Sequence, residues 1–183
     1  MLLPTVAAER RVGLSICIAL SLIVSMVGTA SATTIRLTPP VLAALRTARV
    51  PVLVPTTVPD SLHVVGVAVD VPQTGSAGYS LDLVYDARCI GTHGAGDACT
   101  AASIEAFQPP QAAAAGMTRV RLSDGSTGYY HSGPCGANCH GSFQLTFVRM
   151  NTTYTIAINA GTLSQALAIE RGLRPLSLRK GLR

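Results

Sequence analysis

The chain has 183 residues, a formal net charge of +5 and no tryptophan. The excess charge is confined to the C-terminus, because residues 33–170 hold 7 basic and 8 acidic residues and are close to neutral. A nucleic-acid-binding domain would need a basic stripe across its folded surface, so we expect no nucleic-acid partner. At most, the basic end could make weak contacts with an anionic lipid or polymer.

The first 32 residues have the pattern of a secretory signal peptide. A basic lead precedes an uncharged apolar run from Val12 to Val27, and Ala30-Ser31-Ala32 fits the small-x-small cleavage rule. The run has 16 residues, fewer than the roughly 20 that a membrane-spanning helix needs. We therefore predict cleavage before Thr33, a secreted or periplasmic mature protein, and no stable membrane span after cleavage. The alternative is that the segment stays attached as an anchor.

The rest of the chain is long enough for one domain with its own core. We predict a single domain over 33–173 and a basic C-terminal tail over 174–183. The sequence Thr38-Pro39-Pro40 predicts the start of a short helix, with proline in its first turn. Prolines recur between residues 50 and 59, which excludes a helix or a central strand there and predicts an extended edge segment over the domain.

Strands are predicted over 63–71, 79–85 and 102–107. The second strand alternates apolar and polar residues, as half-buried strands do, and we expect Asp82 and Asp86 on its solvated face. Two hairpins follow. The first pairs 119–123 with 127–131 through Asp124-Gly125, and the second pairs 143–148 with 154–158 through Met150-Asn151.

The last predicted element is a helix with signals at both ends. Thr162 and Gln165 form a capping box, and Gly172, followed by Leu173 and Pro175, predicts a left-handed cap and a stop. Strands in series with helices near both ends predict an α+β fold. In it, an antiparallel β-sheet carries a short N-terminal helix and a C-terminal helix packed on one face.

Four cysteines remain after the predicted cleavage: Cys89, Cys99, Cys135 and Cys139. An even number of cysteines in an exported domain indicates disulfide bonds. Four cysteines allow three pairings. We favour Cys89–Cys99 and Cys135–Cys139, because each pair flanks a glycine-rich turn.

The segment 129–140 holds the densest cluster of candidate site residues. Thiolate and imidazole groups bind zinc, so a metal-dependent or hydrolytic enzyme is one alternative, with His131, Cys135, Cys139 and His140 as its residues. Zinc fingers and ribbons use other spacings, and export favours oxidised thiols. We therefore predict no metal, no cofactor and no catalytic residue in this cluster.

A contact surface is the interpretation that we favour for the same segment. Loops held on a rigid frame commonly carry recognition. The surface that we predict comprises Tyr129, Tyr130, His131, Asn138 and His140.

Four stretches resemble a group of small exported bacterial proteins of unknown function. They are Val50–Pro55 after a short helix, Gly78-Tyr79 ahead of Cys89 and Cys99, Gly128-Tyr129-Tyr130 ahead of Cys135-Gly136-Ala137-Asn138-Cys139, and Tyr154-Thr155-Ile156 before the last helix. The strand–helix ending is also similar to the C-terminal part of envelope sensor and anti-sigma-associated domains. The resemblance implies the fold and the location, and it brings no activity.

These observations predict a non-catalytic binding or structural module of the cell envelope. Its partner would be an unknown envelope protein or a small ligand. Besides the enzyme named above, a second alternative is a periplasmic carrier that holds an apolar ligand in the concavity of a curved sheet.

Overall fold

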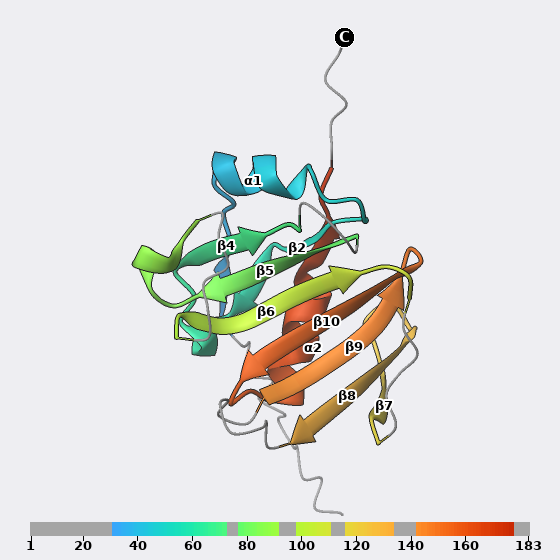
Figure 1. The fold of residues 1–183 in the computed structure, drawn as a ribbon. Helices are drawn as coiled ribbons and strands as arrows, with labels where there is room; N and C mark the ends of the chain where they lie inside the picture. Colours follow the sequence, from blue (N-terminus) through green and yellow to red (C-terminus); the bar gives the residue numbers. More distant parts are fainter. Residues whose placement is uncertain (1–30, 73–76, 92–97, 111–115, 134–141, 178–183) are drawn as a thin grey trace, which may run out of the picture.

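Figure 1 shows a computed structural model of the chain, which describes residues 31–72, 77–91, 98–110, 116–133 and 142–177. Its frame is a seven-stranded sheet in which every neighbouring pair of strands is antiparallel. In order across the sheet, the strands are β4 (Gly66–Asp70), β5 (Gly78–Val84), β6 (Thr100–Phe107), β10 (Thr152–Asn159), β9 (Ser142–Arg149), β8 (Thr127–Gly133) and β7 (Thr118–Arg121).

Two α-helices accompany the sheet in the described residues, α1 (Pro39–Leu45) and α2 (Leu163–Gly172). In the view of Figure 1, α2 lies behind the sheet, against β9 and β10, and α1 lies above β4. The α+β class, with a short N-terminal helix and a C-terminal helix on one face of an antiparallel sheet, is thus confirmed. Neither helix has the length and hydropathy to cross a membrane, in the part of the chain that the structure describes.

The hydrophobic core lies between the sheet and α2. Alternation along β9 and β10 turns Leu145 and Ile156 to this side, where both are fully buried, and the rings of Phe147 and Tyr154 stack with centroids 5.6 Å apart. The predicted Met150-Asn151 turn joins the two strands, and both of its residues have positive φ. Such a conformation at both central positions suits the right-handed twist of a tight hairpin.

The proline-rich segment lies outside the large sheet, as predicted, and forms two short ribbons. Its strand β2 (Leu53–Pro55) pairs with β11 (Leu173–Pro175), and its strand β3 (Thr57–Pro59) pairs with β1 (Ala32–Thr34). Between them, the Thr56 backbone N–H donates to the Gly172 carbonyl at 3.0 Å, and its carbonyl accepts from the Ile35 N–H at 3.0 Å. One segment therefore holds both ends of the domain.

Two tyrosines of the sheet fix this segment over the core. The Tyr79 hydroxyl donates to the Leu53 carbonyl at 2.8 Å and accepts from the Leu53 N–H at 2.9 Å. The Tyr154 hydroxyl donates to the Pro51 carbonyl at 2.8 Å. Burial raises the pKa of Tyr79 well above its usual value, because the low-dielectric surroundings disfavour the phenolate.

The end of α2 differs from the prediction. Its capping box at Thr162 is present, but Gly172 is the last helical residue and has no positive φ, so the predicted left-handed cap is wrong. The chain passes directly into β11, because Thr56 supplies the donors for the Gly172 carbonyl. Arg174 and Pro175, predicted to start the tail, therefore belong to the fold.

The aspartates predicted to share a face of one strand do not do so. Strand β5 ends at Val84, and Asp86 caps the following 3-10 helix η2 (Ala87–Cys89). Its carboxylate accepts from the Arg88 side chain and from the Arg88 N–H at 2.9 Å. These contacts lower the pKa of Asp86 to about 2, and the hydrogen bond from the Arg88 side chain has the largest effect. The local turn, with its own hydrogen bonds, interrupts the alternation that the sequence suggested.

Two further predictions concern the start of β4 and the first pair of cysteines. The strand predicted over 63–71 begins only at Gly66, because a 3-10 helix η1 (Asp60–Leu62) ends at His63 in the left-handed conformation. Cys89 and Cys99 lie at disulfide distance, as predicted, with Cα atoms 6.2 Å apart. Cys135 and Cys139 lie outside the described residues.

Candidate binding surface

The side of the seven-stranded sheet opposite α2 carries neither of the two α-helices found in the described residues (Figure 1). Side chains that stand directly opposite in paired strands point to the same side, so the strand register identifies this surface. We call it the open face. Its middle row runs from β5 to β7 through Ser80, Glu105, Thr155, Thr146, Tyr129 and Arg119. A second row consists of Asp82, Ser103, Ala157, Gln144 and His131.

Hydroxyl groups dominate the centre of the open face. Thr146 and Thr155 are half-buried, and their hydroxyl oxygens lie 3.2 Å apart in a cross-strand hydrogen bond. Their backbones are fixed by the β9–β10 and β6–β10 pairings, which are continuous over this region. The centre is therefore a rigid surface that presents hydrogen-bonding groups at fixed spacings.

Acidic residues lie at the β5–β6 end of the open face. The Ser80 hydroxyl donates to the Asp82 carboxylate at 3.3 Å, and Asp82 is only 9% exposed. Burial of part of the Glu105 side chain raises the pKa of that carboxyl, and the neighbouring Asp82 charge raises it further. Both effects disfavour a negative charge on Glu105 beside the charge of Asp82.

Arginines lie at the opposite end, on β7. Arg119 and Arg121 are exposed on the open face, two residues apart, and the Arg119 guanidinium donates to the Thr127 hydroxyl at 3.1 Å. They line a shallow hollow of about 400 Å³ together with Val120, Gly125 and Thr127. Guanidinium groups bind carboxylates and phosphates through charge-assisted hydrogen bonds. The open face is thus acidic at one end and basic at the other.

The predicted contact residues of β8 divide between the two sides of the sheet. Tyr129 and His131 point to the open face, opposite Thr146 and Gln144. Tyr130 points to the other side, where its ring stacks on Phe143 with centroids 5.5 Å apart. Adjacent residues of a strand must point in opposite directions, so the predicted surface cannot contain all three. Asn138 and His140 lie outside the described residues.

A metal site is not found in the part of the chain that the structure describes, where no group of three or more His, Cys, Asp or Glu side chains could hold an ion. The predicted alternative cluster has only His131 in that part, and this side chain is exposed. Its other members, Cys135, Cys139 and His140, lie outside the described residues.

A buried charge cluster links α2 to the sheet, and the sequence analysis missed it. The side chain of Glu170 is 0% exposed and forms an ion pair with Arg149 of β9. Glu170 also accepts from the Ser123 hydroxyl at 2.9 Å, while Arg149 pairs with Asp124 at 2.8 Å and lies over the Phe147 ring. Helical spacing could have indicated that Glu170 is buried, because it lies four residues after Ala166 on the apolar side of α2, but not which side chains it meets.

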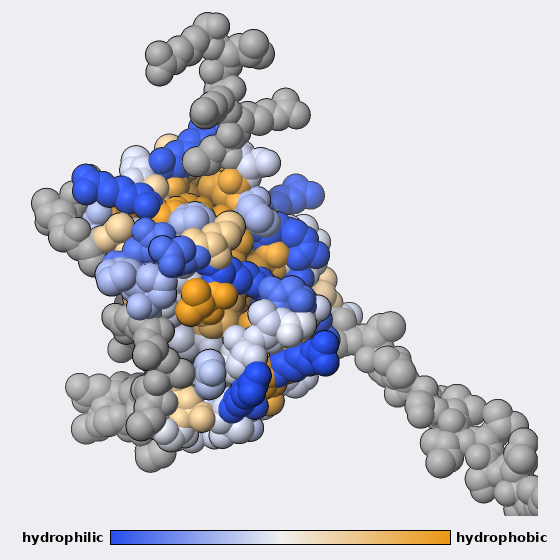
Figure 2. Space-filling model, turned by 90° about the vertical axis from the view of Figure 1, so that its right-hand side faces the viewer, coloured by the Kyte–Doolittle hydropathy of each residue, from blue (hydrophilic) through white to orange (hydrophobic). Residues whose placement is uncertain are grey.

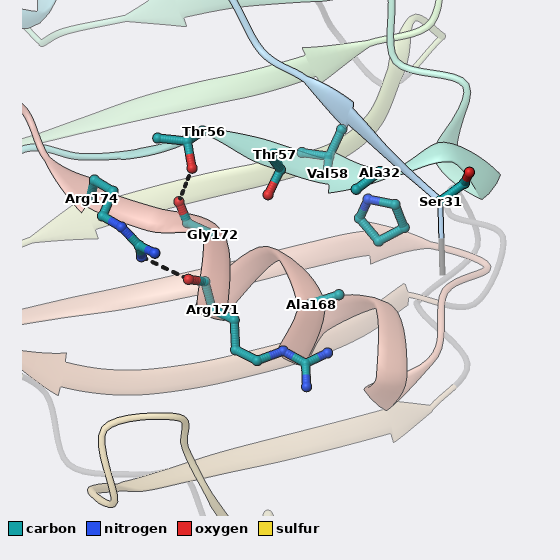
Figure 3. A pocket seen from close by; sticks show the side chains of 10 residues that line it. Ser31, Ala32, Thr56, Thr57, Val58, Ala168, Arg171, Gly172 and Arg174 are labelled. Carbon is teal, nitrogen blue, oxygen red and sulfur yellow. Dashed lines mark hydrogen bonds between the residues drawn. The ribbon is translucent and has the colours of Figure 1, made fainter. Parts of the chain in front are cut away.

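A second hollow of about 250 Å³ lies between α2 and the β1–β3 ribbon (Figure 3). Ala168 and Arg171 of α2 line one side, and Ala32 and Val58 line the other. Arg174 closes one end, where its guanidinium donates to the Arg171 carbonyl at 2.7 Å (Figure 3). This guanidinium is thus engaged by the end of the helix.

Large apolar patches do not mark the side of the molecule shown in Figure 2. Hydrophobic residues form small areas there, separated by strongly hydrophilic ones.

Comparison of the chain with protein-family models, with curated proteins and with solved structures gives no match. The resemblance to small exported bacterial proteins therefore stays a prediction.

Proposed function

We propose that the protein is an exported, non-catalytic binding module of the cell envelope, and that the open face is its contact surface. The observation that carries the proposal is the row from Ser80 to Arg119, in which side chains of six neighbouring strands present polar groups on one rigid surface. The signal-peptide pattern and the Cys89–Cys99 pair support an oxidising location outside the cytoplasm.

The partner that suits the basic end of this surface is a protein with an acidic patch. Arg119 and Arg121 would bind its carboxylates, and the hydroxyls of Thr146 and Thr155 would exchange hydrogen bonds with its polar groups. Tyr129 adds an aromatic side chain of the kind enriched in protein interfaces. The polar character of the open face does not favour the apolar-ligand carrier, which would need an apolar concavity.

Site-specific photo-crosslinking in the exported protein tests the proposal. A photoreactive amino acid at Thr146 stands at the centre of the open face, and one at Ala43 stands on the exposed side of α1 as the matched control. We expect a crosslinked protein from Thr146 and not from Ala43. We also expect the Thr146 adduct to disappear when Arg119 and Arg121 are both replaced by Glu.

Two outcomes would contradict the proposal. Equal crosslinking from Thr146 and Ala43 would mean that contact is not confined to the open face. A Thr146 adduct that persists when Arg119 and Arg121 are both replaced by Glu would mean that the partner does not bind through an acidic patch. Thermal unfolding of every variant is measured first, so that loss of the fold is not taken for loss of contact.

A further inference from the structure

The predicted export cleavage point lies inside the folded part of the chain. Residues Ser31 and Ala32 precede the Ala32–Thr33 bond, and Ala32 already belongs to β1, opposite Pro59. The Asp60 N–H donates to the Ser31 carbonyl at 3.1 Å. Processing at this bond would therefore remove two residues that contact the domain.

The Asp60 side chain lies next to the residue that would become the new N-terminus. The Thr33 hydroxyl donates to the Asp60 carboxylate. Asp60 is the first residue of η1, is exposed, and takes part in none of the ion pairs found among the described residues. Its position is fixed by the β1–β3 register, in which Thr33 stands opposite Val58.

We infer that Asp60 binds the α-ammonium group that export processing creates on Thr33. In the cleavage, which the host's signal peptidase would catalyse, water adds across the Ala32–Thr33 peptide bond. The hydroxyl goes to the Ala32 carbonyl carbon, and the Thr33 nitrogen receives the proton. That nitrogen takes up a further proton from solvent and becomes an ammonium. A charged donor beside a carboxylate forms a stronger hydrogen bond than the hydroxyl that contacts Asp60 in the uncleaved chain.

The rest of the β1–β3 ribbon stays attached after the cleavage. Thr34 remains opposite Thr57, and the Ile35 N–H still donates to the Thr56 carbonyl at 3.0 Å. The ammonium would thus be held at the end of an anchored strand and would not have to be captured from a free chain. Loss of Ser31 and Ala32 also removes part of one wall of the hollow in Figure 3, while Val58 stays in place.

The inference rests on the export part of the proposed function, and one experiment separates the two. The full-length chain is expressed with its own signal, the exported protein is purified, and mass spectrometry identifies its N-terminus. Urea unfolding is then compared before and after selective acetylation of the α-amino group. Three proteins are measured: the wild type, Asp60→Asn and the control Asp70→Asn, which removes an exposed carboxylate at the end of β4.

We expect Thr33 as the first residue and a folding equilibrium constant that acetylation lowers about 2- to 5-fold in the wild type and in Asp70→Asn, the range of an exposed ion pair. Acetylation should leave Asp60→Asn unchanged. An equal effect in Asp60→Asn would overturn the ammonium pairing and leave export intact. Exported protein that keeps Met1 would overturn the cleavage and with it the new ammonium group, whereas absence of the protein from the exported fraction would overturn export itself. If Asp60→Asn does not fold, Asp60→Ser replaces it.

Discussion

The ion pair between Arg149 and Glu170 gives the most demanding test of the structure. Replacing Arg149 by Met keeps the apolar contact with Phe147 and removes the positive charge. Glu170, whose side chain is 0% exposed, would keep the Ser123 hydroxyl but lose its charged partner. Leaving a buried charge unpaired costs about 3–5 kcal/mol. The more exposed Asp124 contact adds about 1 kcal/mol at most, since that carboxylate is 44% exposed.

The assay is equilibrium unfolding in urea with the disulfide intact. With a slope of roughly 2 kcal/mol per molar, a loss of about 4 kcal/mol lowers the urea midpoint by about 2 M. Arg119→Met is the control, because this arginine is exposed and its guanidinium donates to the Thr127 hydroxyl at the exposed end of the sheet. Its midpoint should move by less than about 0.3 M, as for most surface substitutions.

The double variant Arg149→Met with Glu170→Leu decides whether the reasoning is right. Replacing both members of a buried ion pair by apolar groups is often close to neutral. We therefore expect the double variant to be more stable than Arg149→Met alone. A midpoint for Arg149→Met within about 0.3 M of the wild type, or strictly additive losses in the double variant, would refute the argument that Glu170 needs this partner.

Three further predictions concern single positions. Arg88→Ala should raise the pKa of Asp86 from about 2 toward its ordinary 3.8, and NMR titration would measure this change. Any stability gained from Asp86 is present above pH of about 4 and is lost as the pH falls through the lowered pKa. Gly128→Ala should lower the thermal midpoint by the equivalent of about 1–3 kcal/mol, because an added Cβ would lie 2.8 Å from Leu122. Met150→Gly should raise the urea midpoint by the equivalent of about 0.5–1 kcal/mol, because Met150 has φ of 48° and relief of this left-handed strain exceeds the extra chain entropy that glycine loses on folding.

Local patterns in the sequence predicted much of the fold. The hairpin around Met150-Asn151 and the capping box at Thr162 follow from residues close together in the chain, and both are present. Gly172 was rightly singled out, but for the wrong reason. A Cβ there would lie 2.7 Å from the Thr57 carbonyl oxygen, so the glycine permits a close approach between segments more than 100 residues apart and has no positive φ.

Long-range contacts explain what the sequence could not provide. Ser123 and Arg149 reach Glu170 across separations of 47 and 21 residues, and no local pattern indicates that these three side chains meet. The open face could be predicted from the sequence only in part. Alternation along a strand indicates which residues share a side, but the predicted surface grouped Tyr129 with Tyr130 against this rule. Only the strand order brings Glu105 of β6 and Arg119 of β7 onto one surface.

The segment from Leu53 to Pro59 also determines how the domain would respond to force. The chain enters β1 beside Pro59 and leaves β11 beside Leu53, so the two ends of the domain depart from opposite ends of the same segment. Pulling the ends apart would load the hydrogen bonds of both ribbons in shear, all at the same time, rather than opening them one after another. A tether at either end would therefore act on these two ribbons before it reached the seven-stranded sheet.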